Sequence, residues 1–150
     1  MEEGLFVATV ERNHTFNGSV DKVFAGLRKY ERYPEYLPGV TDIAILPAKV
    51  AGSVCQVRYD INLIKKFYYV LNMFEDAPKT LSWELAESNL MKANTGSWSL
   101  KAGKKGTTEA SYSLDIKFRG LVPSAVSDRI AQANLPSMFE GFQHLIEAEA

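Results

Sequence analysis

Side chains that could perform acid-base or metal chemistry are few and scattered in this chain. His14 and His144 lie far apart in the sequence, and neither has a cysteine, histidine or carboxylate at a recognised metal-ligand spacing. The single cysteine, Cys55, can form neither an internal disulfide nor a cysteine-based zinc site. We therefore predict no metal site and no cofactor, and we interpret these residues as ordinary core or surface positions.

Motifs for nucleophilic catalysis and phosphate binding are incomplete or missing. The chain has no G-x-S-x-G elbow, and "GKKG" at residues 103–106 lacks the rest of a phosphate-binding loop, so we interpret it as a hairpin turn. An enzyme would need an acid or base facing a cavity, and the candidates are Tyr112, Arg58 and His14. Arg58 shares a strand face with Asp60, so it either forms a solvent-side pair or reaches into a cavity. We assign no catalytic residue.

Composition limits the class of protein and its partners. The 150 residues are 46% hydrophobic, which fits one domain spanning 1–150 with a sizeable core. A net charge of -1 gives no long-range attraction for nucleic acid or anionic lipid. The N-terminus does not have the pattern of a signal peptide, and no stretch approaches the roughly 20 apolar residues of a membrane span. We expect a soluble, cytoplasmic protein without a nucleic-acid partner or stable membrane insertion, although transient membrane contact remains open.

The first third of the chain predicts a strand followed by short helices. Residues 5–16 alternate between apolar and polar side chains, and Ser19 can cap a helix whose apolar stripe is Val20, Val23, Phe24 and Leu27. Pro34 and Pro38 disfavour continuation of that helix. The stretch "RYPEYLPG" is therefore predicted to be a broken helical turn.

The remainder predicts several strands and then a long helix. Between residues 40 and 118 the strands are separated at "AG", "LIKK", "EDAP", "ESNLMK" and "AGKKG". The clearest alternation runs over residues 107–119, whereas "FYYVLNMF" is ambiguous because both of its faces are largely apolar. After "RGLVP" the period becomes helical for roughly 25 residues, or about 37 Å, with a kink expected at Pro136. The sheet should wrap around this helix, because no other element is long enough to cover it.

Four segments together resemble a known superfamily. They are "GSVDKVFAGLRKYERYPEYLPGV", "GSWSL", "EASYSLDIKFRGLVP" and "LPSMFEGFQHLIE", in that order. The chain resembles the START-like (SRPBCC) helix-grip superfamily over residues 8–147, and within it the polyketide cyclase/dehydrase-like group and the coenzyme Q-binding proteins. After "YLP" this chain has Gly39 and Val40 where coenzyme Q-binding proteins usually have tryptophan and cysteine.

The resemblance implies an α+β helix-grip fold and an apolar cavity. The fold would be a curved antiparallel sheet of about seven strands around the C-terminal helix, with two short helices after the first strand. The ligand would be a lipid, an isoprenoid quinone or a polyketide-like molecule. Two alternatives remain: a polyketide cyclase or dehydratase, and a protein-interaction module without a cavity.

Candidate cavity residues come from the sheet, from the C-terminal helix and from "RYPEYLPG", which we expect to form a lid over the cavity mouth. The lid contributes aromatic side chains with polar tips, which suit a boundary between an apolar cavity and water. Sheet members follow from alternation and helix members from their apolar stripe. The candidates are Tyr33, Tyr36 and Leu37 in the lid, Trp83, Trp98, Tyr112, Leu114 and Ile116 on the sheet, and Ile130, Phe139 and Phe142 on the helix.

Overall fold

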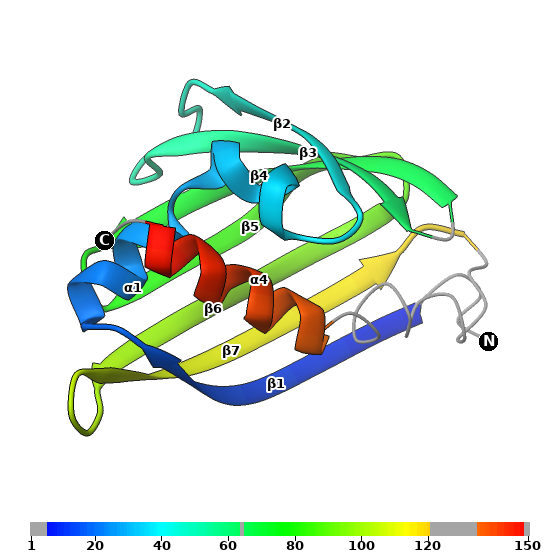
Figure 1. Ribbon diagram of the computed structural model, residues 1–150. Coiled ribbons are helices and arrows are strands. Elements are labelled where there is room, and N and C mark those ends of the chain that lie inside the picture. The colour runs from blue at the N-terminus through cyan, green and yellow to red at the C-terminus, as the bar shows by residue number, and fades with distance from the viewer. Residues whose placement is uncertain (1–5, 64, 121–134, 149–150) are drawn as a thin grey trace.

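A curved antiparallel sheet with helices on its concave side forms the computed structural model (Figure 1). The structure describes residues 6–63, 65–120 and 135–148. Its strands are β1 (Phe6–Asn17), β2 (Val40–Leu46), β3 (Cys55–Leu63), β4 (Lys65–Asp76), β5 (Thr80–Ser88), β6 (Met91–Ala102) and β7 (Thr107–Phe118). Its helices are α1 (Val20–Leu27), the 3-10 turn η1 (Tyr30–Arg32), α2 (Tyr33–Tyr36) and α4 (Leu135–Ala148).

The strand order is β1-β7-β6-β5-β4-β3-β2. Strands β2 to β7 follow one another as neighbours, whereas β1 pairs with β7 at the far edge. The segment from α1 to α2 therefore carries the chain from one edge of the sheet to the other. This arrangement confirms the predicted helix-grip α+β fold, and the strand breaks lie where the sequence placed them.

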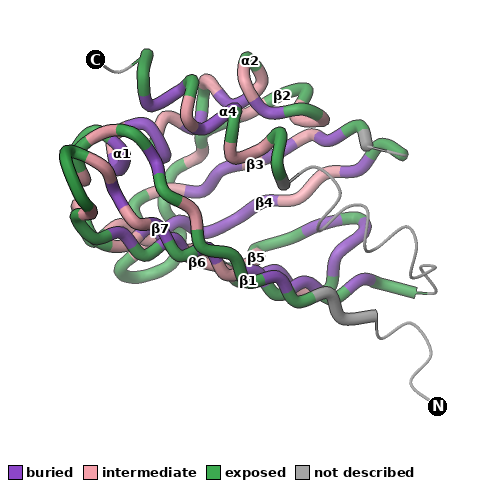
Figure 2. Tube along the Cα trace, turned by 60° about the horizontal axis from the view of Figure 1, so that its bottom comes forward, coloured by how far each residue is buried: buried purple, intermediate pink, exposed green. Residues whose placement is uncertain are grey.

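Alternation along β7 shows how the sheet divides core from solvent. Tyr112, Leu114 and Ile116 are buried, while Asp115 and Lys117 between them are exposed. The same change from buried to exposed residues is visible along the neighbouring strands (Figure 2). One face of β7 therefore packs against the helices, as its period of two predicts.

The short helices follow the predicted signals. The hydroxyl of Ser19 accepts a hydrogen bond from the Lys22 amide at 3.3 Å, which caps α1. Pro34 lies at the start of α2, where its missing amide proton costs no helical hydrogen bond. The predicted broken turn is thus η1 followed by α2.

Helix α4 lies across the concave face of the sheet, with α1 beside its C-terminal end (Figure 1). Phe142, Leu145 and Ile146 form its buried stripe. The side-chain amide of Gln143 bonds both main-chain groups of Asn17, accepting at 2.8 Å and donating at 3.0 Å. The described helix spans 14 residues, or about 21 Å. The first part of the long predicted helix lies outside the described residues, and the kink at Pro136 stays a prediction.

Candidate functional site

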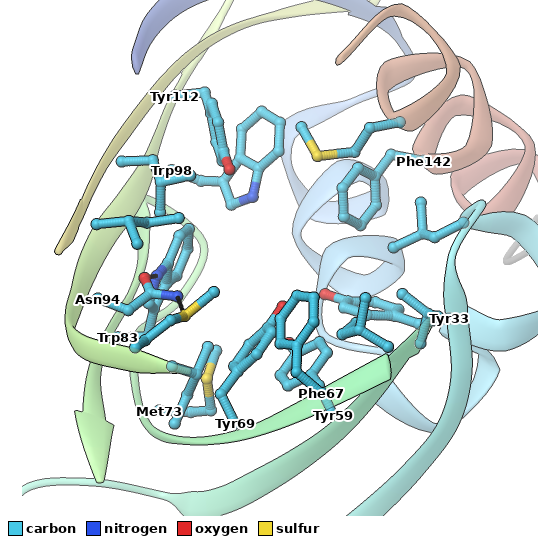
Figure 3. Close-up of a pocket in the computed structure, with 18 of the residues that line it drawn as sticks. Tyr33, Tyr59, Phe67, Tyr69, Met73, Trp83, Asn94, Trp98, Tyr112 and Phe142 are labelled. Atoms are coloured by element: carbon cyan, nitrogen blue, oxygen red, sulfur yellow. Dashed lines mark hydrogen bonds between the residues drawn. The ribbon is translucent and has the colours of Figure 1, made fainter. Parts of the chain in front are cut away.

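An apolar cavity of about 170 Å³ lies between the sheet, α4 and the α2 segment (Figure 3). Its walls come from almost every element that faces the concave side. The lining residues are Tyr33, Leu37, Pro38, Val40, Tyr59, Ile61, Phe67, Tyr69, Leu71, Met73, Trp83, Met91, Asn94, Trp98, Tyr112, Leu114, Ile116, Met138 and Phe142.

Most of the candidates selected from the sequence meet at this cavity. Those that line it are Tyr33, Leu37, Trp83, Trp98, Tyr112, Leu114, Ile116 and Phe142. The sheet members reach it because their strands alternate, and Phe142 reaches it from the buried stripe of α4. Direct contact of these side chains with a ligand stays a prediction.

Two other candidates, Tyr36 and Phe139, do not line the cavity, and a third lies outside the described residues. Tyr36 is half-exposed and contacts Arg32 instead of the cavity. The Arg32 guanidinium lies 5.5 Å from the centroid of the Tyr36 ring, and Arg32 Nη2 donates to the Tyr36 hydroxyl at 3.2 Å. Phe139 instead stacks on His14, with ring centroids 4.7 Å apart. Ile130 lies outside the described residues.

The wall formed by β3 and β4 was missed at the sequence level. Its inward side chains are Tyr59, Ile61, Phe67, Tyr69, Leu71 and Met73. Alternation was concealed in the sequence because Tyr68, Val70 and Phe74, on the other face of β4, are also aromatic or aliphatic. That face also buries the polar side chain of Asn72. Asn72 is satisfied there by Gln56, whose Nε2 donates to Asn72 Oδ1 at 2.9 Å. The period of two in Val57, Tyr59 and Ile61 on β3 was the signal that could have revealed this wall.

Tyr33 fixes the lid against the rest of the molecule. Its hydroxyl donates a hydrogen bond to the carbonyl of Leu27 at the end of α1. Its ring lies edge-on to Phe142 at 5.3 Å and 6.1 Å from the ring of Tyr59. Tyr33 is therefore a wall of the cavity joined to both α4 and β3, rather than an exposed flap.

Close backbone approach holds α2 against α4. A Cβ atom built on Gly141 would lie 2.3 Å from the carbonyl oxygen of Tyr36, which is closer than any real contact. Only glycine at this position lets α4 approach the lid this closely. The lid and the helix consequently form one packed side of the cavity.

Polar groups in the cavity wall are few and uncharged. Trp83 Nε1 donates to Asn94 Oδ1 at 3.0 Å, and Asn94 Nδ2 lies 3.5 Å from the sulfur of Met91. Burial raises the pKa of Tyr112. Burial also raises the pKa of Tyr69, with a smaller electrostatic contribution from Tyr112. These phenols are therefore neutral hydrogen-bonding groups near neutral pH.

Of the proposed acid-base candidates, only Tyr112 reaches the cavity. His14 is half-buried between Phe16 and Phe139, and this burial lowers its pKa. No aspartate, glutamate, histidine, lysine or arginine is found among the described lining residues. Within the described part of the chain, no group of three histidine, cysteine or acidic side chains could hold a metal ion.

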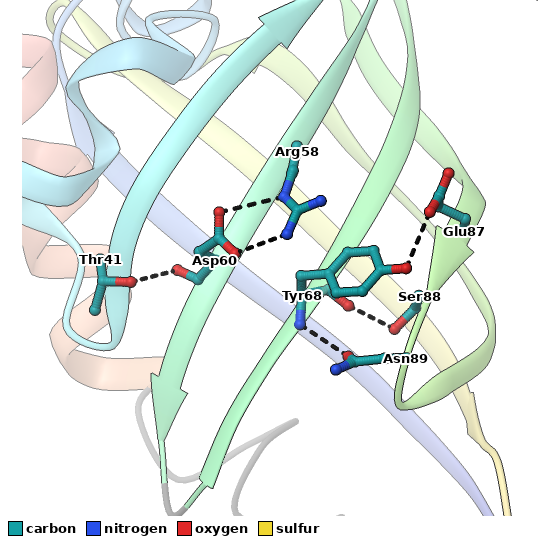
Figure 4. A network of polar contacts seen from close by, with 7 residues as sticks. All are labelled: Thr41, Arg58, Asp60, Tyr68, Glu87, Ser88 and Asn89. Atoms are coloured by element: carbon teal, nitrogen blue, oxygen red, sulfur yellow. Dashed lines mark hydrogen bonds and ion pairs between the residues drawn. The ribbon is translucent and has the colours of Figure 1, made fainter.

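Arg58 forms the solvent-side pair that the sequence left as one of two alternatives. Its Nη2 lies 3.2 Å from Asp60 Oδ1, and its guanidinium lies 4.2 Å from the centroid of the Tyr68 ring (Figure 4). The Tyr68 hydroxyl donates to Glu87 at 3.0 Å. This network lies on the outer face of the sheet, away from the cavity.

Comparison with known proteins identifies a related family and similar structures. A family model described as polyketide cyclase/dehydrase and lipid transport matches residues 7–148. A search of curated proteins finds no match. None of the helices within the described ranges has the length and hydropathy of a transmembrane segment.

Solved structures share the fold at low sequence identity. A START superfamily protein from Mycobacterium smegmatis aligns with a TM-score of 0.80 and 16% identity, covering 95% of this chain and 99% of that one. The Zhui aromatase/cyclase from Streptomyces sp. R1128 aligns with a TM-score of 0.76 and 14% identity, covering 96% and 94%. A protein from Thermus thermophilus has a TM-score of 0.77 and 14% identity, with 95% and 99% coverage. At these identities the similarity establishes the fold alone.

Proposed function

Since this chain belongs to the polyketide cyclase/dehydrase and lipid transport family, we propose that it binds a compact, mostly apolar molecule in the cavity between the sheet and α4. The observation that carries this proposal is the wall itself. Aromatic and aliphatic side chains from the lid, the strands and α4 converge on one space, and the described lining residues bring no formal charge to it. Binding would be driven by removal of apolar surface from water, at about 25 cal/mol per Å².

The volume of the cavity limits the size of the ligand that it can hold. An engineered protein cavity of about 150 Å³ holds benzene, so about 170 Å³ suits a molecule of one or two rings. A long acyl chain or an isoprenoid tail would require the cavity to widen. Among the ligands expected from the sequence, a small polyketide-like ring system therefore fits this cavity better than a lipid or a coenzyme Q-type quinone.

Binding without catalysis is better supported than a cyclase or dehydratase activity. Of the three acid-base candidates, Arg58 lies on the outer face and His14 is packed against Phe139. Turnover would therefore depend on Tyr112, whose raised pKa makes it a weak acid and keeps it protonated. Cytoplasmic location and transient membrane contact during ligand exchange stay predictions.

Native mass spectrometry of gently purified protein, followed by organic extraction, tests the proposal. We expect a co-purified or added small apolar compound to bind with a stoichiometry of one. Ile116→Phe places extra volume in the cavity and should abolish that binding. Lys117→Phe, with the same new side chain on the exposed face of the same strand, should retain it. Equal binding by both variants, or no uptake of one- and two-ring compounds by the wild type, would overturn the proposal.

A further inference from the structure

The donor groups of Tyr112 and Trp98 lie in the cavity wall without a hydrogen-bond partner in the described part of the chain. Tyr112 and Trp98 are only 8% and 2% exposed, yet neither the Tyr112 hydroxyl nor Trp98 Nε1 has a hydrogen-bond partner among the described residues. In the same part of the chain, every side-chain polar atom that is sealed from open space is hydrogen-bonded. The two groups therefore border the cavity, and Figure 3 shows both directed into it.

Other buried aromatic side chains have hydrogen-bond partners for their polar atoms. Tyr33 donates to a carbonyl, Tyr30 donates to Glu75 at 2.7 Å, and Trp83 donates to Asn94 at 3.0 Å. Buried polar groups are normally satisfied in this way, because an unmade hydrogen bond is unfavourable. The described residues offer no such partner to Tyr112 and Trp98, and a bound ligand can supply one.

The opposite wall also presents hydroxyl groups. Tyr59 and Tyr69 stack with ring centroids 4.7 Å apart, and neither hydroxyl has a partner among the described residues. Both residues line the cavity. A ligand between the walls would therefore meet phenols on two sides and aromatic faces between them.

We propose that the ligand is a compact cyclic molecule with a carbonyl oxygen that accepts hydrogen bonds from Trp98 Nε1 and the Tyr112 hydroxyl. This inference rests on the proposed function and defines the ligand class. An indole N–H can only donate, so the group that meets Trp98 must be an acceptor. The rings of Tyr112 and Trp98 are direct neighbours, with centroids 4.7 Å apart, so we assign the Tyr112 hydroxyl as the second donor to this oxygen.

A plain hydrocarbon of the same shape fits the site less well. It would displace any water from the two donors without replacing the hydrogen bonds that the water made. The carbonyl compound retains those bonds and buries the same rings. The difference in affinity between the carbonyl compound and the hydrocarbon should therefore be larger than their similar volumes would predict.

The matched probes 1-tetralone and tetralin, which differ by one carbonyl group, test this inference by isothermal titration calorimetry. We expect the wild type to bind 1-tetralone about tenfold more tightly than tetralin. Tyr112→Phe should weaken 1-tetralone binding by about three- to tenfold and leave tetralin binding unchanged, since only the hydroxyl is lost. Tyr68→Phe is the matched control, because it removes a hydroxyl from the outer face.

The indole N–H resonance of Trp98 in the wild-type protein provides a second test, which needs no substitution in the cavity. The chain has 2 tryptophans, and Trp83 Nε1 is already bonded to Asn94. In proton–nitrogen spectra, 1-tetralone should move the Trp98 indole resonance downfield, whereas tetralin should not. Equal affinity for the two probes, or an indole resonance that does not respond, overturns the inference and leaves the proposed function standing. Binding of neither probe overturns both.

Discussion

The indole of Trp83 packs against Gly96, its pairing partner on β6. A Cβ atom built on Gly96 would lie 2.3 Å from Trp83 Cζ2 and 2.6 Å from the carbonyl oxygen of Ser113. The second of these neighbours is backbone and cannot rotate away. The absence of a side chain at residue 96 thus positions Trp83 in the cavity wall, where Asn94 holds its indole nitrogen.

Gly96→Ala should therefore destabilise the fold and disturb the cavity together. We expect a loss of about 1–3 kcal/mol in the free energy of unfolding, as for other overpacked sites. Urea unfolding followed by far-UV circular dichroism gives the loss, and binding of 1-tetralone reports on the cavity. Thr95→Ala, at the exposed neighbouring position, is the control. An unfolding free energy equal to that of this control would show that the sheet accommodates the added methyl group.

Glu75 connects the end of α1 to β4. Its carboxylate accepts from Arg28 Nε at 3.0 Å and from the Tyr30 hydroxyl at 2.7 Å, and its side chain is only 10% exposed. Glu75→Ala leaves the buried Tyr30 hydroxyl without its acceptor and should cost about 1–3 kcal/mol. Thermal and urea unfolding measure the loss. Glu84→Ala, on the exposed part of β5, should cost much less; similar losses in the two variants would contradict this role for Glu75.

Packing of His14 against Phe139 predicts a pH dependence of stability. Burial lowers the pKa of His14 below its ordinary value of 6.5, so the folded state disfavours the protonated ring. As pH falls through about 6.5, the unfolded state binds the proton first, and stability is lost; above that range the contribution is constant. His14→Gln should therefore lose less stability than the wild type between about pH 7.5 and about pH 5.5. Parallel losses, measured by urea unfolding, would show that His14 takes no part.

The fold class and the strand breaks could be predicted because local signals and long-range packing agree. The residues of β7 alternate cleanly, so one period assigns both the strand and its buried face. The wall formed by β4 could not be assigned in this way. Tyr68, Val70 and Phe74 on its other face remove the contrast between apolar and polar residues on which alternation depends.

The identity of the cavity residues was only partly predictable, for a different reason. Core residues and cavity walls have the same apolar pattern, so sequence alone could not separate Phe142, which lines the cavity, from Phe139, which stacks on His14. In the lid, the direction of each side chain decides whether it reaches the cavity. Tyr33 and Tyr36 look equivalent in the sequence. In the structure the Tyr33 side chain points inward and is buried, whereas the hydroxyl of Tyr36 is bonded to Arg32.

The tether from Tyr33 to Leu27 makes a prediction that separates the stability of the lid from ligand binding. Tyr33→Phe keeps the ring between Phe142 and Tyr59 but removes the hydrogen bond to the Leu27 carbonyl. We expect a loss of about 0.5–1.5 kcal/mol in unfolding free energy, with 1-tetralone affinity nearly unchanged because the cavity wall keeps its shape.

Tyr33→Ala, by contrast, removes the wall itself. It should cost about 3–5 kcal/mol and weaken binding of 1-tetralone, because the cavity then opens toward α2. Tyr36→Phe serves as the control, since its side chain is half-exposed and lies outside the cavity. If Tyr33→Phe weakened binding as strongly as Tyr33→Ala did, the hydroxyl rather than the ring would be the group that shapes the site, and the assignment of Tyr33 as an apolar wall would be wrong.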